Sequence, residues 1–147
     1  MNNYKHILLG VDFYENCDAV AFRAKELAAH YQAQLSIVHV FDSLPMTDAS
    51  YGMDMPFNMD LTNELMAGAK KRLSELAEKL AVPASNAWLE MGSPKAEIIR
   101  VAEEKQVDLI VVGSHGRHGL ALLLGSTANG VLHHAHCDVL AVRLQDN

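Results

Sequence analysis

The fold of this chain is decided by the stretch Asp108-Leu109-Ile110-Val111-Val112-Gly113-Ser114-His115-Gly116. It contains four consecutive aliphatic residues, a pattern typical of a parallel strand that is covered on both faces. Gly113 ends this apolar run, and Gly116 follows three residues later. The pattern predicts a buried strand whose carboxyl end opens into a glycine-rich segment.

Four more short apolar runs occur along the chain, at residues 6–11, 35–41, 87–91 and 138–144. Between the five runs, apolar residues recur at the three- and four-residue spacing of helices, at residues 17–31, 60–80, 94–105 and 126–135. Strands that alternate with helices pair in parallel through right-handed crossovers. We therefore expect one α/β domain over residues 1–147, a doubly wound open five-stranded parallel sheet with four helices. Numbered along the chain, the expected strand order is 3-2-1-4-5.

The composition limits the partners of this protein. Its 147 residues are 50% hydrophobic and 20% charged, with a formal net charge of −6, which suits a single domain that needs no disulfide or metal. An acidic chain lacks the clustered Lys and Arg that hold nucleic acid, and no apolar stretch approaches the ~20 residues of a membrane helix. The amino terminus has no secretory pattern, and the two cysteines lie 120 positions apart. We expect reduced thiols in a cytoplasmic protein without a nucleic-acid or membrane partner.

Residues 42–59 form a long connection without a helical or strand pattern. They include four methionines and three aspartates, with no Lys or Arg. Connections of this length inside a compact domain are commonly functional or mobile. We therefore expect a flexible loop there.

The segment after the strand at 108–113 has features of an anion site. Its glycines, Gly113, Gly116 and Gly119, let backbone amides approach a ligand. Gly125-Ser126-Thr127 then begins a helix whose first N–H groups and dipole favour phosphate, and Arg117 supplies the one Lys or Arg of the segment. The same residues have an equally open structural explanation without a ligand, because Ser126 or Thr127 can cap its own helix.

Six motifs follow one another in a fixed order: Tyr4 to Asp12, Ile37 to Val40, Gly92-Ser93-Pro94 with Glu97-Ile98-Ile99, Asp108 to Gly116, Leu124-Gly125-Ser126 and Cys137 to Arg143. Each motif is weak alone, whereas the ordered set resembles the universal stress protein family over essentially the whole chain. The resemblance implies a cytoplasmic, homodimeric stress-response protein and, in one branch of the family, an ATP-binding one.

In the ATP-binding branch the motif is Gly-x-x-Gly, nine residues, then Gly-Ser/Thr. By this resemblance, Asp12 and Val40 border adenine and ribose, and the glycine-rich segment holds the ribose and phosphates of ATP. The candidate residues of that segment are Gly113, His115, Gly116, Arg117, Gly125, Ser126 and Thr127.

This chain departs from the motif, because eight residues separate Gly116 from Gly125. One residue fewer shifts the start of the helix by up to about 3.5 Å of extended chain, or ~100° of helical turn. The family's branch related to the founding stress protein A does not retain ATP, and its shorter spacer resembles this one. Two functions are therefore open: a non-catalytic stress-response homodimer, and an adenine-nucleotide-binding switch with slow ATP hydrolysis.

Patterns of catalysis and metal binding are weak in this chain. The Gly-x-Ser-x-Gly motif is absent, and the single carboxylate of Asp12 is not an acid–base pair. Five histidines gather near the carboxyl end, but the adjacent His133 and His134 point in different directions on a helix and form no ready chelate; the five are His115, His118, His133, His134 and His136. We expect exposed histidines at a helix end, no metal site and no enzyme.

The last apolar run lies at one edge of the expected sheet. Its edge residues are Val139, Leu140, Ala141 and Val142. An exposed apolar edge invites pairing with another chain, and a two-fold dimer removes that edge. We therefore expect a homodimer through this strand.

Overall fold

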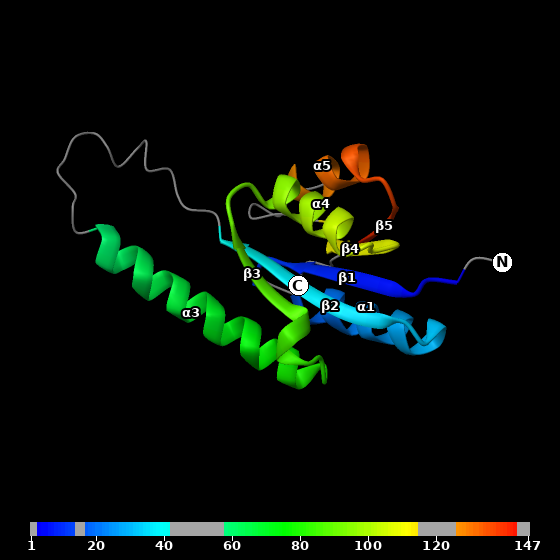
Figure 1. Ribbon diagram of the computed structural model, residues 1–147, viewed down its shortest axis with the longest axis horizontal. Helices are drawn as coiled ribbons and strands as arrows, with labels where there is room; N and C mark the ends of the chain where they lie inside the picture. The colour runs from blue at the N-terminus through cyan, green and yellow to red at the C-terminus, as the bar shows by residue number, and fades with distance from the viewer. Residues whose placement is uncertain (1–2, 14–16, 42–57, 115–125, 144–147) are drawn as a thin grey trace.

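The computed structural model describes residues 3–13, 17–41, 58–114 and 126–143. Within these ranges five strands alternate with four α-helices (Figure 1). The strands are β1 His6–Val11, β2 Gln34–Phe41, β3 Ala87–Met91, β4 Leu109–Gly113 and β5 Asp138–Val142. The helices are α1 Cys17–Tyr31, α3 Asn58–Lys79, α4 Pro94–Glu104 and α5 Ser126–His134, and a 3-10 turn, η1 Ala84–Asn86, precedes β3.

All neighbouring strands pair in parallel, in the order β3-β2-β1-β4-β5. Leu9 of the central strand β1 pairs with Ile37 of β2 on one side and with Val111 of β4 on the other. The chain proceeds from β1 outward to β3 and then crosses back to β4, so the strand order reverses between β1 and β4. The expected doubly wound five-stranded sheet with strand order 3-2-1-4-5 is confirmed.

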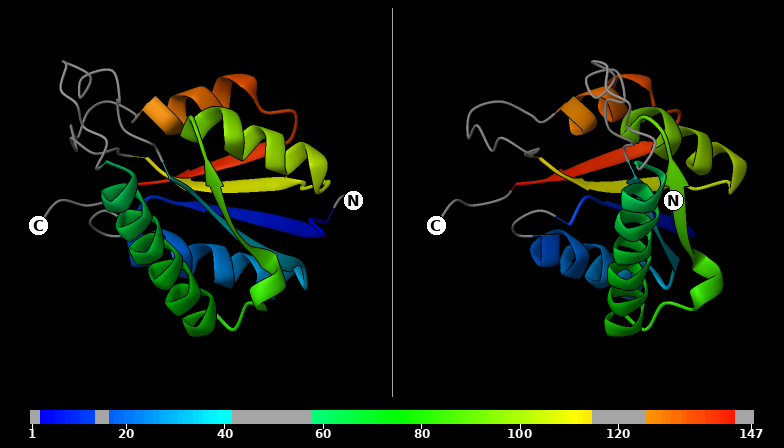
Figure 2. Two further views of the ribbon diagram at one scale, coloured as in Figure 1. Left: turned by 60° about the vertical axis from the view of Figure 1, so that its left-hand side comes forward. Right: turned by 90° about the vertical axis from the view of Figure 1, so that its left-hand side faces the viewer.

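The helices cover both faces of the sheet, which makes three layers (Figure 2). α1 and α3 pack on one face, and α4 and α5 pack on the other. In β1, Ile7 and Leu9 belong to the first of these cores and Leu8 to the second, and all three side chains are fully buried. Each such burial contributes about 1.5–3 kcal/mol. Coverage on both faces explains why the central strands are continuous apolar runs in the sequence.

The observed bounds agree with the sequence-based ones to within two residues, but three local details of the structure differ from expectation. α3 begins at Asn58, inside the expected loop, whose residues 42–57 lie outside the described ranges. The three- and four-residue spacing of apolar residues over 60–80 predicts a buried stripe that includes Leu65. Leu65 is instead 49% exposed, because the amino-terminal part of α3 extends past the strand ends (Figure 1). Ser93 and Pro94 predict a capping hydroxyl before a first-turn proline, but the Ser93 side chain makes no capping hydrogen bond.

Candidate functional site

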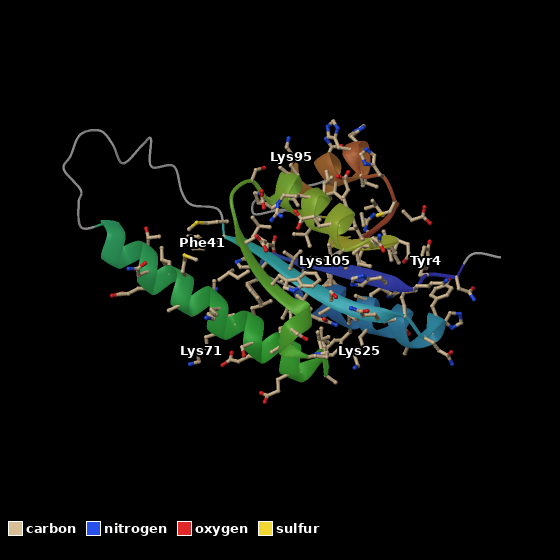
Figure 3. All side chains as sticks on the ribbon, viewed as in Figure 1. Tyr4, Lys25, Phe41, Lys71, Lys95 and Lys105 are labelled. Carbon is tan, nitrogen blue, oxygen red and sulfur yellow. The ribbon has the colours of Figure 1, made fainter. Side chains whose placement is uncertain are left out.

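A hollow lies at the carboxyl edge of the sheet, where the strand order reverses; Phe41, the last residue of β2, marks this edge in Figure 3. The helices that follow β1 and β4 lie on opposite faces of the sheet, and such a divergence opens a crevice between strand ends. The strands contribute Gly10, Val11, Val40, Val112 and Gly113 to its lining, and Asp12, directly after β1, completes this side. The helices contribute Pro94, Ile98, Thr127 and Ala128.

Gly10 controls how closely α4 approaches the sheet at this hollow. A Cβ at Gly10 would lie 3.0 Å from Ile98 Cδ1 and 3.3 Å from Val112 Cγ1. Both distances are shorter than the optimal separation of two carbon atoms. Glycine therefore allows the buried Ile98 to reach β1 and to form one wall of the hollow.

Four of the residues predicted from the sequence meet at this hollow: Asp12, Val40, Gly113 and Thr127. They come from the ends of three strands and from the first turn of α5. Ser126 begins α5, but its side chain is outside the described part of the chain. The other predicted residues also lie outside the described ranges; they are His115, Gly116, Arg117 and Gly125.

The hollow combines an apolar wall with a polar rim. Val11, Val40 and Ile98 line it and are each at least nine-tenths buried. Asp12 is the one ionisable side chain among the described lining residues. Thr127 lies in the first turn of α5, where the N–H groups and dipole of a helix attract anions. This arrangement can hold a flat apolar ring against the wall and an anionic group at the amino end of α5.

The sequence places Phe13 at the ligand-binding end of the first strand, but it predicts neither the backbone of Phe13 nor the contact of its ring with His39. Phe13 has a left-handed backbone with φ of 60°, and its ring centroid lies 4.7 Å from that of His39. His39 Nδ1 donates a hydrogen bond of 2.8 Å to the carbonyl oxygen of Val11, and burial lowers the pKa of His39. The neutral ring thus holds the end of β1. A left-handed phenylalanine leaves no pattern in a sequence, whereas a histidine inside the apolar run 35–41 was a visible signal.

Within the described ranges, no group of three or more His, Cys, Asp and Glu side chains is placed to hold a metal ion. His133 and His134 are exposed in the last turn of α5, as expected from the sequence. No helix in the same ranges is long and apolar enough to cross a membrane.

β5 forms one edge of the described sheet, beside β4. Its residues Val139 to Val142 are all partly exposed. The strand that was expected to mediate dimerisation therefore occupies the expected edge position.

The fold and the site together define the class of this protein: a doubly wound α/β domain with a hollow where the strand order reverses. Residues 3–143 match the universal stress protein family. Universal stress protein A homolog 2 of Coxiella burnetii is 44% identical over 146 residues, which cover 99% of each chain. The chain belongs to the universal stress protein family, as its motifs indicated.

Solved structures of similar proteins share this fold. Universal stress protein UspA from Lactobacillus plantarum has a TM-score of 0.79 and 29% identity, and the comparison covers 97% of this chain and 100% of that one. A universal stress protein in complex with cAMP has a TM-score of 0.67 and 21% identity, with 97% and 98% of the two chains covered. Because its identity to this chain is 21%, the protein in complex with cAMP shows a similarity of fold alone.

Proposed function

We propose that this chain is a non-catalytic, homodimeric stress-response protein of the cytoplasm that binds an adenine nucleotide in the hollow at the carboxyl edge of its sheet. The observation that carries the proposal is that Asp12, Val40, Gly113 and Thr127, distant in sequence, line one hollow. A protein of the same fold is in complex with cAMP, which is a precedent for an adenine nucleotide in this architecture.

Charge and polarity suggest how the nucleotide lies. The carboxylate of Asp12 repels phosphate and accepts hydrogen bonds from hydroxyl groups such as those of ribose. The amino end of α5, at Thr127, favours phosphate. In the proposed orientation the adenine ring packs against Val40 and Ile98, ribose faces Asp12, and the phosphates lie at α5.

Binding rather than turnover is the proposed role of the hollow. Phosphoryl transfer needs groups that position the nucleophile and neutralise charge on the transferred phosphate. Asp12 is the sole ionisable side chain among the described lining residues, so these residues contain no acid–base pair. We expect any ATP hydrolysis to be far slower than the turnover of about 1 s⁻¹ at the low end of ordinary enzymes.

A second function is favoured by one observation, the spacer of eight residues between Gly116 and Gly125. A helix that starts one residue early or late presents different N–H groups to a phosphate. In this alternative, the protein is a stress-response homodimer that acts through protein partners and retains no nucleotide.

Nucleotide analysis of the purified full chain separates the two functions. The protein is denatured and its extract is analysed for adenine nucleotides, and equilibrium dialysis then measures binding of ATP, AMP and cAMP to nucleotide-free protein. We expect about one retained nucleotide per chain, or a Kd below about 1 mM, which corresponds to roughly 4 kcal/mol of binding free energy. If the purified protein retains no nucleotide and binds none of the three at millimolar concentration, the result supports the second function.

Thr127→Val tests the phosphate end of the proposed orientation. The substitution keeps the side-chain shape and removes the hydroxyl at the start of α5. A hydrogen bond to a charged group contributes about 1.5–3 kcal/mol, so we expect ATP to bind about 10-fold or more weakly. Thr62→Val, the same substitution in α3 outside the hollow, is the matched control and should leave the Kd unchanged. Equal affinity of the two variants would contradict the placement of phosphate at Thr127.

We propose in addition that the homodimer forms through β5. β5 has no charged residue between Asp138 and Arg143, so its edge is suited to pairing with a second copy. The opposite edge, β3, carries Glu90, whose Oε1 lies 2.9 Å from Arg100 Nη2. Charged side chains on an edge strand oppose pairing, which favours β5 over β3 as the interface.

A further inference from the structure

A second hollow lies at the opposite end of α4 and α5. Its floor is apolar and is formed by Ile99, Ala102, Val107, Ile110 and Ala135. Its rim is formed by Glu103, Gln106, His136 and Cys137. In Figure 3, Lys105 marks this end of α4, and Lys95 marks the end near the first hollow. The two hollows share no lining residue, so the second one is separate from the proposed nucleotide site.

The size and floor of the second hollow suit a small apolar group. Ile110 is fully buried, and Ala102 and Val107 are 5% and 7% exposed. The space measures about 220 Å³, whereas an apolar cavity of about 150 Å³ is enough to hold benzene. The hollow therefore has room for one aromatic ring or one branched aliphatic group.

The rim of the second hollow is electronegative. α4 and α5 both end beside it, and the carboxyl ends of helices carry partial negative charge that attracts cations. Glu103 adds a carboxylate, which accepts a hydrogen bond from His136 Nδ1 at Oε2. A carboxylate accepts hydrogen bonds at both oxygens, so Glu103 can also receive an ammonium group.

The cationic side chains of α4 near this end are engaged with other groups. Lys105 Nζ lies 5.1 Å from the ring centroid of Trp88. Arg100 forms ion pairs with Glu90, Glu97 and Glu104. The described charges at this rim therefore favour a positively charged ligand.

We propose that the second hollow binds a small organic amine, whose apolar body lies on the floor and whose ammonium group pairs with Glu103. Neutral molecules of the same size fill the floor without the ion pair. Anionic ones place a negative charge beside Glu103 and two helix carboxyl ends. The proposal thus specifies an order of affinity as well as a place.

Three probes of nearly equal size test this order on the full chain: benzylamine, benzyl alcohol and benzoate. Binding is followed by backbone amide shifts in two-dimensional NMR spectra. We expect the largest shifts at Ile110, Ala135 and Cys137. Benzylamine should bind about 3- to 10-fold more tightly than benzyl alcohol, the size of a partly exposed charge interaction at helix ends, and benzoate should bind most weakly.

Two pairs of variants test separately the charge of Glu103 and the space inside the second hollow. Glu103→Gln should reduce the preference for benzylamine over benzyl alcohol, because only the partial charge of the helix ends remains, whereas Glu78→Gln, on the exposed side of α3, should leave it unchanged. Ala135→Leu fills the hollow and should weaken all three probes, whereas Ala29→Leu, exposed on α1, should not. Circular dichroism confirms that each variant is folded.

A thiol measurement tests the site without altering its wall. In a Cys17→Ser background, Cys137 is the single thiol of the chain, and benzylamine should slow its reaction with an aromatic disulfide reagent. Equal binding of the three probes would overturn the assignment of an amine. Unchanged reactivity of Cys137, or shifts confined to Gly10 and Val112 at the first hollow, would overturn the site.

Discussion

Gln32, Ala81 and Gln106 have left-handed backbones, with φ of 56°, 59° and 57°. Each closes the end of a helix with the same pair of hydrogen bonds. After α3, the Ala81 N–H donates to the Glu78 carbonyl at 3.1 Å and the Val82 N–H to the Ala77 carbonyl at 2.8 Å. This is the Schellman arrangement, in which glycine is the usual left-handed residue. A side chain there costs roughly 1–2 kcal/mol.

Ala81→Gly should therefore stabilise the protein. Relief of the left-handed strain exceeds the added chain entropy of glycine, so we expect the free energy of unfolding to rise by about 0.5–1 kcal/mol. Ala67→Gly, at an exposed interior position of α3, is the matched control and should lower it by about 0.5–1 kcal/mol. Urea denaturation measures both changes. If both substitutions change the free energy of unfolding in the same direction, the backbone geometry at position 81 does not determine the change.

His39 should make stability depend on pH. Burial lowers the pKa of His39 in the folded chain, while in the unfolded chain it titrates near about 6.5. The unfolded chain therefore binds the proton first as pH falls, and stability is lost between about pH 6.5 and the lower folded-state pKa. We expect wild type to lose more stability than His39→Gln between pH 7.5 and 5.5 in urea denaturation. An equal loss in both would assign the pH dependence to other groups.

The packing of α4 on the sheet depends on the missing side chain at Gly10, and its replacement affects both stability and the first hollow. Gly10→Val would place methyl groups against Ile98 and Val112, and overpacking of this kind costs about 1–3 kcal/mol. We expect a lower midpoint of thermal unfolding together with weaker nucleotide binding.

Gly68→Ala is the control for this substitution. A Cβ at Gly68, within α3, meets no atom within 4 Å. The gain in helix propensity should therefore raise the free energy of unfolding by about 1 kcal/mol. Destabilisation by both changes would mean that contact with Ile98 is not the cause at position 10.

The elements were predictable where a single physical cause produces the sequence pattern. β1 and β4 are covered by helices on both faces, so their apolar runs are continuous and their ends are sharp. The apolar spacing of α3 wrongly predicted that Leu65 is buried, because this spacing does not report how far a helix extends past the sheet. The prediction that the Ser93 hydroxyl caps α4 was also wrong, since residue type alone does not determine side-chain direction.

The part of the candidate site that lies at the strand ends was predictable from the sequence. Asp12, Val40 and Gly113 lie at the ends of apolar runs, and parallel strands bring their carboxyl ends to one edge. The position of Gly10 at this edge was predicted, but its close approach to Ile98 was not, because that contact arises from the packing of α4 on the sheet. That approach depends on packing between residues 88 positions apart, which a local pattern does not contain.

At the scale of the whole molecule, the described sheet has two unequal edges. β3 places Glu90 in an ion pair with Arg100, whereas the interior of β5 is wholly aliphatic. Leu140 and Val142 pack against the core on the α1 and α3 side, and Val139 packs against the other core. An edge that is apolar on both faces gains most from a second copy, since pairing satisfies its backbone and buries its side chains together.

Val142→Glu should therefore convert the expected dimer to a monomer, because pairing would bring two carboxylates to the two-fold interface, where like charges repel. Light scattering measures the mass. Leu89→Glu places the same charge on β3, also at a partly buried position against the core, and should leave the dimer intact. Circular dichroism checks that both variants fold, and Ala141→Glu repeats the test at a β5 residue of partial exposure. A dimer that persists in folded Val142→Glu and Ala141→Glu, or a wild type of monomer mass, would exclude β5 as the interface.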